Sequence, residues 1–394
     1  IFFFLIKVKN FFSLKKIILI GFNFNLEKIK LFLNINTYYF MPKYKFIHSG
    51  LNKNIRKINL DFNAKNEFEK FLSSNLIKFL PMSFLEDFKL IQKINIRKTN
   101  ANALIIFTEN DCEYIKFFLS ESILRNCKIA QSQHGGAYGK LKYLDEEINE
   151  INLYDFFLTY GWNYKKALIK EKKKIISFFP LNFKKNITLK RNNGKILIVL
   201  DHLPNEFTSF RSILLAEDYD EVILNKLKKI LFSLSKEKLK NIDIRLPRIN
   251  SLNIINSLKL HFPELNLLPA NESLHKSFSV YKLIVFTGFY TAILEAIYSN
   301  TKMIFLEFEK KNKYRNSFIS TYNSLIDNGI IIKDIKKMKL FLSKYTTNKD
   351  FNYNHNQKNC LTKFKKFYLN DFNPQIFNKF SNFVLKKIEN EKNS

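Results

Sequence analysis

Short apolar runs alternate with longer amphipathic stretches along most of the 394-residue chain. A short continuous apolar run is typical of a strand that is buried on both faces, and a longer amphipathic stretch is typical of a helix. Strand, helix and strand in succession build a parallel sheet with helices on its faces. The sequence therefore predicts an α/β protein, and the length of the chain favours two domains over a single core.

The first half of the chain predicts one Rossmann-like domain over residues 1–180. A helix is expected from Leu26 onward and another over Asp111–Arg125. The predicted strands are Lys16–Gly21, Ala103–Thr108, Lys128–Ser132, Tyr154–Tyr160 and Ile175–Phe179.

A polar, basic and weakly periodic stretch, Pro180–Gly194, separates this half from the next, and we predict a linker over residues 181–194. A second Rossmann-like domain is predicted over residues 195–345, followed by a helical, basic tail over residues 346–394. Helices are expected over Glu221–Leu239 and Thr291–Ser299. The predicted strands are Lys195–Leu200, Ile242–Leu246, Leu283–Phe286 and Met303–Leu306.

Two doubly wound domains can place the carboxyl ends of their strands across a cleft from each other. The loop that follows Lys128–Ser132 and the turn Thr287–Thr291 both begin where a predicted strand ends. We therefore expect this loop and this turn to face each other.

The chain has a formal net charge of +30, but its lysines are spread over its whole length and form no basic block. Lys, Asn, Ile and Phe are abundant together, as expected from an AT-biased coding sequence, which raises lysine content without selection for anionic partners. Nucleic acid is therefore not an expected partner. The weaker expectation is that the surface attracts anionic lipid headgroups or polyanionic substrates.

Apolar residues make up 46% of the chain and aromatic residues 15%, which is enough for a substantial packed interior. The cysteines Cys112, Cys127 and Cys360 have neither disulfide-like nor zinc-like spacing, which fits a reducing compartment such as the cytoplasm. The opening run Ile1–Ile6 is too short to cross a membrane. Any membrane association is therefore expected to be peripheral.

A glycine-rich loop with one histidine, Gln131–Gly139, is the most informative local motif. It holds three of the nine glycines of the chain. Glycine allows the backbone to approach a ligand closely, and a histidine at a strand end can transfer protons at neutral pH. The alternative interpretation is a simple glycine turn with a surface histidine.

The turn Thr287–Thr291 leads from a buried strand into an apolar helix. The start of a helix presents unpaired N–H groups to a phosphate, Gly288 permits close approach, and the two threonines offer hydroxyls. Glu295, one turn into the helix, could accept hydrogen bonds from ribose hydroxyls. The alternative is that Thr287 caps the helix and Glu295 is solvated.

Arginine is scarce relative to lysine in this chain, and Arg245 and Arg248 flank the end of a predicted strand. The planar guanidinium group of arginine can donate two parallel hydrogen bonds to an oxyanion such as a phosphate. The alternative is that both arginines are solvated at the surface. Arg211 is a weaker candidate of the same kind.

Other polar groups have simpler interpretations. Asp218–Asp220 is interpreted as helix capping, and Asp145–Glu150 as a solvated face. No metal site is predicted, because five histidines lack a convergent partner in the sequence. They are His48, His202, His261, His275 and His355.

Together these motifs resemble one family, a set of transferases found in O-antigen and surface-carbohydrate loci. The resemblance covers roughly residues 100–335 and lies in Gln133–Gly139, Ile244–Pro247, Thr287–Phe308 and Ser317–Ile332. More distantly, the chain is similar to CDP-glycerol glycerophosphotransferases and other glycosyltransferases of the GT-B fold. Relatives carry consecutive Ser or Thr residues where this chain has Gly288-Phe289-Tyr290, so phosphate contacts there would fall to Thr287 and Thr291.

The resemblance implies a GT-B-like fold with a nucleotide-sugar as substrate, no cofactor and no metal. His134 would be the catalytic residue, either as the base that deprotonates an acceptor hydroxyl or as a group that stabilises the reaction centre. Gln133, Gly135, Gly136 and Tyr138 would bind the acceptor side. The donor nucleotide and its phosphates would be bound by Arg245, Thr287, Gly288, Thr291 and Glu295.

The leading hypothesis is a glycosyltransferase that acts on a surface polysaccharide or its lipid-linked precursor at the inner face of the cytoplasmic membrane. A nucleotide-sugar epimerase of the same fold is the alternative within enzymes. A non-catalytic module that binds polysaccharide or nucleic acid is the alternative outside them.

Overall fold

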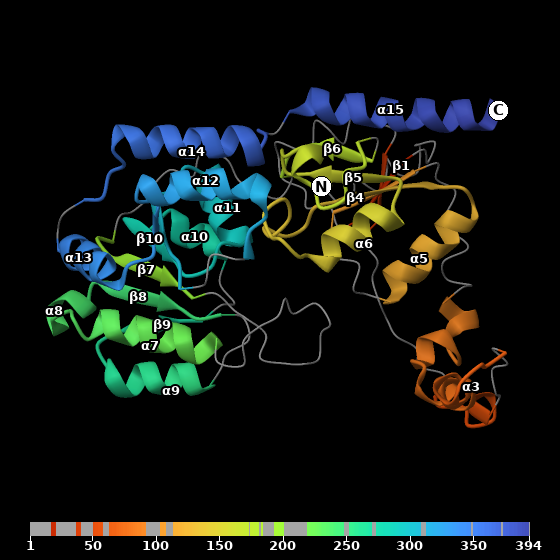
Figure 1. Cartoon of the computed structure of the whole chain (residues 1–394), viewed down its shortest axis with the longest axis horizontal. Coiled ribbons are helices and arrows are strands. Elements are labelled where there is room, and N and C mark those ends of the chain that lie inside the picture. The colour runs from red at the N-terminus through yellow and green to blue at the C-terminus, as the bar shows by residue number, and fades with distance from the viewer. Residues whose placement is uncertain are drawn as a thin grey trace, which may run out of the picture. The chain divides into compact units, whose positions relative to one another are not determined.

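The structure is a computed structural model (Figure 1). It describes residues 17–20, 37–40, 50–57, 63–91, 103–107, 113–172, 174–180, 183, 193–200, 219–247, 252–269, 273–308, 313–347, 350–371 and 373–393. The predicted helix from Leu26, the run Ile1–Ile6, Cys112, His48 and His202 lie outside these ranges, as does most of the predicted linker 181–194.

The first sheet has six strands in the order β2-β1-β3-β4-β5-β6. Its strands are β1 Ile17–Ile20, β2 Thr37–Phe40, β3 Ala103–Ile106, β4 Lys128–Ser132, β5 Phe156–Thr159 and β6 Ile175–Ser177. The strand pairs with a defined register are parallel. Every residue of β3 and β5 is buried, as their continuous apolar runs predict.

The second sheet also has six strands, in the order β12-β11-β10-β7-β8-β9, and its strand pairs are parallel. Its strands are β7 Ile196–Val199, β8 Ile242–Arg245, β9 Asn266–Leu268, β10 Leu283–Phe286, β11 Met303–Leu306 and β12 Ile331–Ile332. The chain winds from β7 outward to β9 and from β10 outward to β12. The strand order therefore reverses between β7 and β10, which is where ligands bind in open α/β sheets.

Helices connect most of these strands. In the first part of the chain they are η1 Ile55–Lys57, α3 Glu67–Phe79, η2 Met82–Phe84, α5 Glu113–Leu124, α6 Asp145–Leu153 and η3 Tyr164–Lys166. In the second part they are α7 Tyr219–Leu231, α8 Lys236–Leu239, α9 Leu252–His261, α10 Leu274–Phe278, α11 Thr291–Tyr298, α12 Asn316–Asp327 and α13 Ile335–Tyr345. The predicted fold class, α/β with parallel sheets, is confirmed.

The single helix predicted over Glu221–Leu239 is wrong in detail, because two helices, α7 and α8, occupy that stretch. Ser235 is the N-cap of α8, and its side chain accepts a hydrogen bond from the backbone N–H of Lys238 at 3.4 Å. A serine that bonds to the backbone in this way favours a new helix start over continuation of the old helix.

The chain forms two compact units, one of residues 1–134 with 374–394 and the other of residues 135–373. The change from the first sheet to the second falls between Ser177 and Ile196, around the predicted linker. The boundary between the compact units does not coincide with this change of sheet and lies after His134. Residues 139–142 belong to the second unit because they are bonded to residues 313–315. Leu141 forms a β-bridge with Tyr314, and the Lys142 N–H donates to the carbonyl of Lys313 at 2.7 Å.

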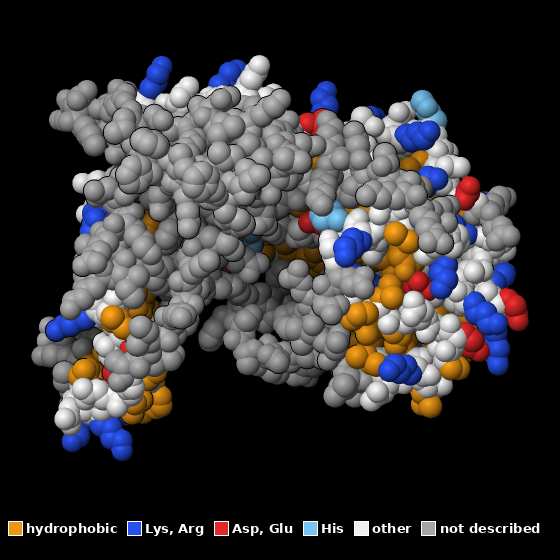
Figure 2. All heavy atoms as spheres, turned by 180° about the vertical axis from the view of Figure 1, so that it is seen from behind, with side chains coloured by type: hydrophobic (Ala, Val, Ile, Leu, Met, Phe, Trp, Pro, Cys, Tyr) orange, Lys and Arg blue, Asp and Glu red, His pale blue; other side chains and the backbone are white. Residues whose placement is uncertain are grey.

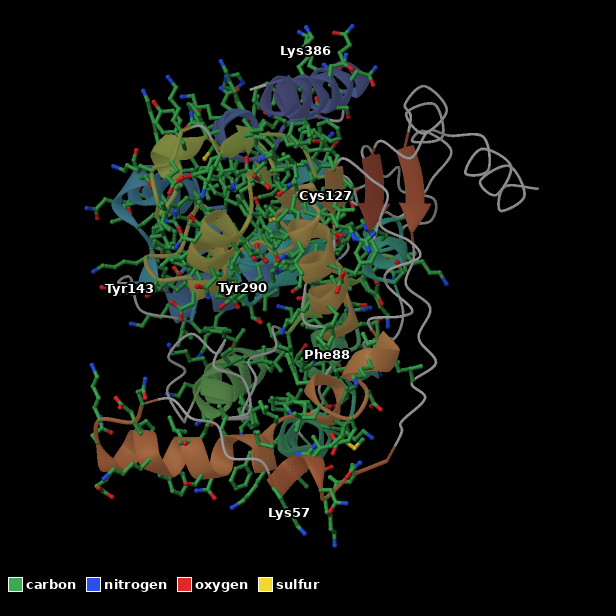
Figure 3. All side chains as sticks on the ribbon, turned by 90° about the vertical axis from the view of Figure 1, so that its right-hand side faces the viewer. Lys57, Phe88, Cys127, Tyr143, Tyr290 and Lys386 are labelled. Carbon is green, nitrogen blue, oxygen red and sulfur yellow. The ribbon has the colours of Figure 1, made fainter. Side chains whose placement is uncertain are left out.

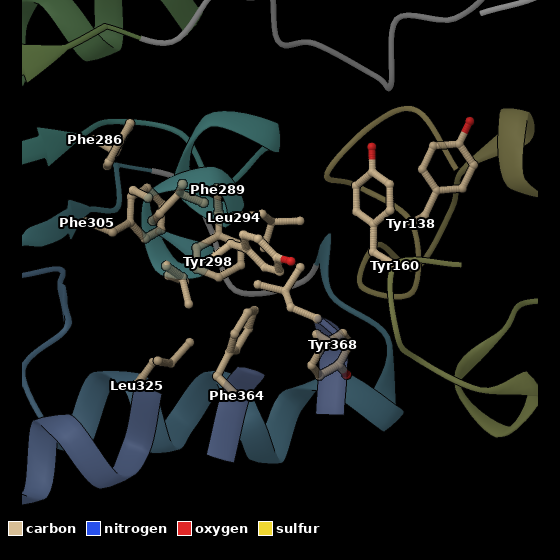
Figure 4. Close-up of a cluster of buried hydrophobic side chains, with 14 of the residues drawn as sticks. Tyr138, Tyr160, Phe286, Phe289, Leu294, Tyr298, Phe305, Leu325, Phe364 and Tyr368 are labelled. Atoms are coloured by element: carbon tan, nitrogen blue, oxygen red, sulfur yellow. The ribbon is translucent and has the colours of Figure 1, made fainter. Parts of the chain in front are cut away.

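The stretch predicted as a helical tail contains two helices, α14 His355–Tyr368 and α15 Pro374–Asn393, which belong to different compact units. α14 belongs to the unit of residues 135–373, where Phe364 packs on the ring of Phe289 with ring centroids 6.0 Å apart (Figure 4). Lys365 Nζ donates to the carbonyl of Tyr298 at the end of α11 (3.0 Å). α14 thus supports the helix that follows β10.

Candidate active site

The glycine–histidine loop begins where β4 ends, in buried polar side chains. Gln131, Ser132 and Gln133 are each no more than 3% exposed. His134 follows, and burial lowers the pKa of its imidazole from 6.5 to about 4. The ring is therefore neutral at pH 7, which is the protonation state that a general base requires.

Gly136 is needed for close approach between two backbones. Its N–H donates to Thr291 Oγ1 at 2.9 Å, and a Cβ at this position would lie 2.3 Å from the carbonyl carbon of Tyr290 and 2.4 Å from the backbone nitrogen of Thr291. The loop and the Thr287–Thr291 turn, predicted to face each other, are thus in direct contact at Gly136.

Replacing Gly136 with Ala is expected to lower the free energy of unfolding by about 3 kcal/mol, the upper part of the usual range for overpacking, because the Cβ meets backbone that cannot rotate away. Urea unfolding followed by the fluorescence of Trp162, the single tryptophan, measures the change. Gly135→Ala is the matched control, since a Cβ there would meet only the Tyr138 ring at 3.4 Å, and it should change stability by about 1 kcal/mol or less. Equal losses for the two variants would contradict this assignment.

Lys140, directly after the glycine–histidine loop, also bonds to the Thr287–Thr291 turn. This residue was not identified from the sequence. Its side chain is buried, Nζ donates to the carbonyl of Phe289 at 3.0 Å, and Nζ lies 4.3 Å from the centre of the Phe289 ring. Burial, and then the charge of Lys313, hold the pKa of Lys140 well below its usual value. One lysine in a lysine-rich sequence carries no signal that could have singled it out.

The Thr287–Thr291 turn lies at the reversal point of the second sheet. The N–H and the hydroxyl of Thr287 both donate to the carbonyl of Val199 in β7, at 3.2 and 3.3 Å. Thr287 therefore does not cap α11, whose N-cap is Tyr290 without a side-chain cap bond. Gly288 is buried, and Thr291 accepts the Gly136 N–H.

Glu295 on α11 is about one-fifth exposed and faces His275 of α10, with 3.5 Å between Oε2 and Nε2, so a protonated His275 would form an ion pair with it. Burial of the Tyr160 hydroxyl raises its pKa, and the negative charge of Glu295 raises it further. Glu295 is therefore not merely solvated. The sequence shows no convergent partner for His275, because Glu295 lies 20 residues further along the chain on another helix.

Arg245, predicted to bind phosphate, is the last residue of β8 and is 9% exposed. It is in register with Val199 of β7, so it lies on the strand next to the reversal point. Arg248 and Arg211 lie outside the described residues.

Tyr138, predicted to bind the acceptor, is 3% exposed and stacks on Phe157 with ring centroids 5.6 Å apart. Its hydroxyl donates to Glu150 Oε2 at 3.0 Å, and burial, then the Glu150 charge, raise its pKa. Tyr138 and Tyr160 lie next to each other at one side of the buried cluster (Figure 4). The structure thus places Tyr138 in the core that supports the loop.

The interpretation of Asp145–Glu150 as a solvated face is wrong. Glu147 is fully buried, and its two carboxylate oxygens accept from Arg315 Nη1 and Nη2 at 2.9 and 2.8 Å. The N–H groups of Gly139 and Leu168 also donate to Glu147, both at 2.9 Å. The sequence did not predict this buried ion pair, because Arg315 lies 168 residues from Glu147 along the chain.

Within the described ranges, no group of three or more His, Cys, Asp or Glu side chains is close enough to hold a metal ion. No helix in that part of the chain is both long and apolar enough to cross a membrane.

Two parallel Rossmann-like sheets, with a turn at the strand reversal of the second, are typical of the GT-B-like fold. The chain belongs to the LIC12162 family of transferases, whose model matches residues 3–379. The family resemblance predicted from the sequence is thereby confirmed. No curated protein matches the chain.

Several solved structures resemble the chain at low sequence identity. The S. aureus MnaA–UDP co-structure is 10% identical, with a TM-score of 0.50 over 92% of this chain and 94% of that one. A structure of the wall teichoic acid polymerase TagF with CDPG is 11% identical, with a TM-score of 0.46 over 99% and 93%. Anabaena HepE in complex with UDP and glucose is 8% identical, with a TM-score of 0.45 over 96% and 100%.

Proposed function

We propose that this transferase is a glycosyltransferase, which moves a sugar from a nucleotide-activated donor to a cell-surface polysaccharide or to its lipid-linked precursor. The observation that carries the proposal is the Thr287–Thr291 turn, which lies at the strand reversal between β7 and β10 with the glycine–histidine loop bonded to it. A donor nucleotide fits this position, because the carboxyl edge of an open sheet binds ligands where the strand order reverses.

In this proposal the phosphates of the donor lie at the start of α11. The N-cap Tyr290 provides no side-chain cap bond, so the first N–H groups of the helix suit an anion. Thr291 accepts the Gly136 N–H and keeps its own hydroxyl hydrogen for a phosphate oxygen. Gly288 allows close approach, and Thr287 holds the turn on β7.

Glu295 would accept the ribose hydroxyls, and Arg245 would stabilise the leaving phosphate without a metal. His134, neutral at pH 7, would take the proton of the acceptor hydroxyl, with Gln133 and Gly135 on the acceptor side. The substrate is the nucleotide-sugar itself, and no separate cofactor takes part.

A cytoplasmic enzyme at an anionic membrane surface fits a lipid-linked acceptor. The net charge of +30 supports attraction to such a surface, and the dispersed lysines disfavour nucleic acid as a partner.

Thermal denaturation with UDP-, GDP-, dTDP-, CDP- and CMP-linked sugars tests the proposal. UDP-sugars come first, because the MnaA structure is a co-structure with UDP. A donor at about 100 times its Kd should stabilise the protein by about 2.7 kcal/mol and raise the Tm by several degrees. Thr291→Val should reduce the shift, whereas Thr362→Val, at an exposed position on α14, should leave it unchanged. If no nucleotide-sugar raises the Tm, the proposal fails.

An epimerase of the same fold is the second candidate, and the two differ in their need for an acceptor. Incubation with the donor alone separates them. An epimerase would convert the sugar of the donor under these conditions, and a transferase would leave it unchanged apart from slow hydrolysis.

A further inference from the structure

The segment of residues 50–57 and 63–91, here called the α3 segment, exposes an unusual set of large apolar side chains. On α3, Phe68 is 68% exposed, Phe71 58% and Phe79 77%. In the same segment Leu51 is 60% exposed and Phe84 46%. Figure 2 shows orange side chains gathered next to blue ones at its lower left, where this segment lies.

The three phenylalanines of α3 share one face of the helix. Phe71 and Phe79 follow Phe68 by three and eleven residues, which returns them to the same side at about 3.6 residues per turn. Ile77, on the opposite side, is the buried residue of α3. The helix therefore turns a weakly apolar side inward and an aromatic stripe, Phe68, Phe71 and Phe79, toward solvent. We call it the α3 stripe.

The orientation of α3 is held by specific bonds. Arg56 Nη1 donates to the carbonyls of Ile77, Lys78 and Leu80 at the end of the helix, at 3.2, 3.0 and 2.9 Å. The same guanidinium binds Glu86 through Nε and Nη2, at 2.8 and 2.9 Å. At the other end the side chain of Asn66 caps the helix. The outward position of the α3 stripe is thus built into the segment.

The charges of the segment favour an anionic partner. Its acidic side chains are engaged: Glu67 pairs with Lys70, Glu69 bonds the residues that precede α3, and Glu86 pairs with Arg56. Asp87 is 3% exposed. Several lysines of the described segment have no ion pair, and Lys78 lies on the helix beside Phe71 and Asn75. They are Lys53, Lys57, Lys65, Lys78 and Lys89. Figure 3 labels Lys57 and Phe88 of this segment.

We propose that the α3 stripe is a membrane-contact surface that inserts into the headgroup region of an anionic lipid bilayer. Aromatic side chains flanked by lysines are typical of helices that lie in this interface. A second copy of the chain is a poorer partner, because each copy carries a net charge of +30 and the lysines around the stripe would repel each other. The proposal rests on the proposed function, which needs a membrane only if the acceptor is lipid-linked.

A second tryptophan, introduced at the stripe, tests contact with lipid directly. The chain contains one tryptophan, Trp162, which is 1% exposed and whose emission should not respond to lipid. With vesicles of equal parts phosphatidylcholine and phosphatidylglycerol, Phe71→Trp should shift its emission to the blue and be quenched by brominated lipid. Phe232→Trp, at a 60% exposed position in the other unit, is the matched control and should do neither. No shift in Phe71→Trp, or an equal shift with pure phosphatidylcholine, would overturn the proposal.

A triple variant, Phe68→Ser with Phe71→Ser and Phe79→Ser, tests the contribution of the stripe to binding. Because these side chains are exposed, the variant should keep the wild-type Tm, and it should weaken vesicle binding by about tenfold or more in a sedimentation assay. If the wild type instead forms dimers without lipid and the variant does not, the stripe is an interface between copies and the proposal is wrong.

The wild type, the triple variant and the Phe71→Trp protein together distinguish this proposal from the proposed function. The Tm shift with a nucleotide-sugar should be equal in the wild type and the triple variant. If no nucleotide-sugar binds but vesicles bind through the stripe, the proposed donor site is contradicted and the proposed membrane-contact surface is supported. If a nucleotide-sugar binds but the emission of the Phe71→Trp protein does not change with anionic vesicles, the membrane-contact surface is contradicted and the donor site is supported.

Discussion

Replacing His134 with Asn or Ala is expected to lower kcat/KM for sugar transfer by about 10²- to 10⁴-fold, the usual contribution of a general base. The imidazole is buried and neutral at pH 7, and an amide or methyl side chain in its place cannot take the acceptor proton. Affinity for the donor should change little, because the groups assigned to the nucleotide lie on other elements. Transfer measured with radiolabelled donor, and donor binding measured by calorimetry, separate the two effects.

His355→Asn is the matched control, since His355 is exposed on α14 and should leave transfer unchanged. A His134→Asn protein with wild-type kcat/KM would exclude the catalytic role. A wild-type protein that transfers no sugar from any donor it binds would instead favour the non-catalytic binding module.

The pH dependence of the wild type follows from the pKa of His134, which is about 4 in the folded protein against an ordinary value of 6.5. Because kcat/KM reports the free enzyme, it should stay flat as the pH falls from 8 to about 5 and decrease near pH 4, as the base becomes protonated. The contribution of His134 to folding has the same sign: it is complete above about pH 6.5 and is lost as the pH falls toward 4, where the unfolded chain binds the proton more readily. A half-point of kcat/KM near pH 6.5 would show an exposed base instead.

Replacing Arg315 with Ala is expected to lower the free energy of unfolding by about 3–5 kcal/mol, because the change leaves the carboxylate of Glu147 buried and without its cation. Arg315 is 7% exposed, and it also donates through Nε to the carbonyl of Leu141 at 2.8 Å. Urea unfolding followed by Trp162 fluorescence reports this loss, since Trp162 lies in the same compact unit.

The pair Glu171–Lys174 is a surface control, with side chains 46% and 32% exposed and 3.5 Å between the charged atoms. Glu171→Ala should cost about 1 kcal/mol or less. The double variant Glu147→Leu with Arg315→Met should recover part of the loss, because it removes both buried charges. If Arg315→Ala costs no more than Glu171→Ala, the pair does not stabilise the loop.

Continuous apolar runs identified β3, β7, β10 and β11 to within two residues, because such a run needs no partner to be recognised. β4 and β8 contain polar residues and were also predicted to within one residue. β2, β9 and β12 were not predicted, and they are only four, three and two residues long. The three-residue strand β6 was recognised as part of the longer run Ile175–Phe179.

The candidate site was predicted in part. The motif around His134 and the Thr287–Thr291 turn were found from glycine, threonine and strand-end position, all of which are local properties. Lys140, His275 and the Glu147–Arg315 pair were missed or misread. Each depends on a partner that is distant in the chain, so its residue type alone is ordinary.

The sequence by itself determined the α/β class, the positions of most strands and some helices among the described residues, and the two strand-end loops that are candidates for chemistry, because these depend on neighbours along the chain. Only the tertiary structure decided that the Gly136 N–H meets Thr291, 155 residues away, and that Arg315 reaches Glu147 over 168 residues. It also decided that the phenylalanines of α3 face water. The physical reason is the same in each case: burial and pairing depend on how sheets and loops pack, and sequence spacing does not encode that packing.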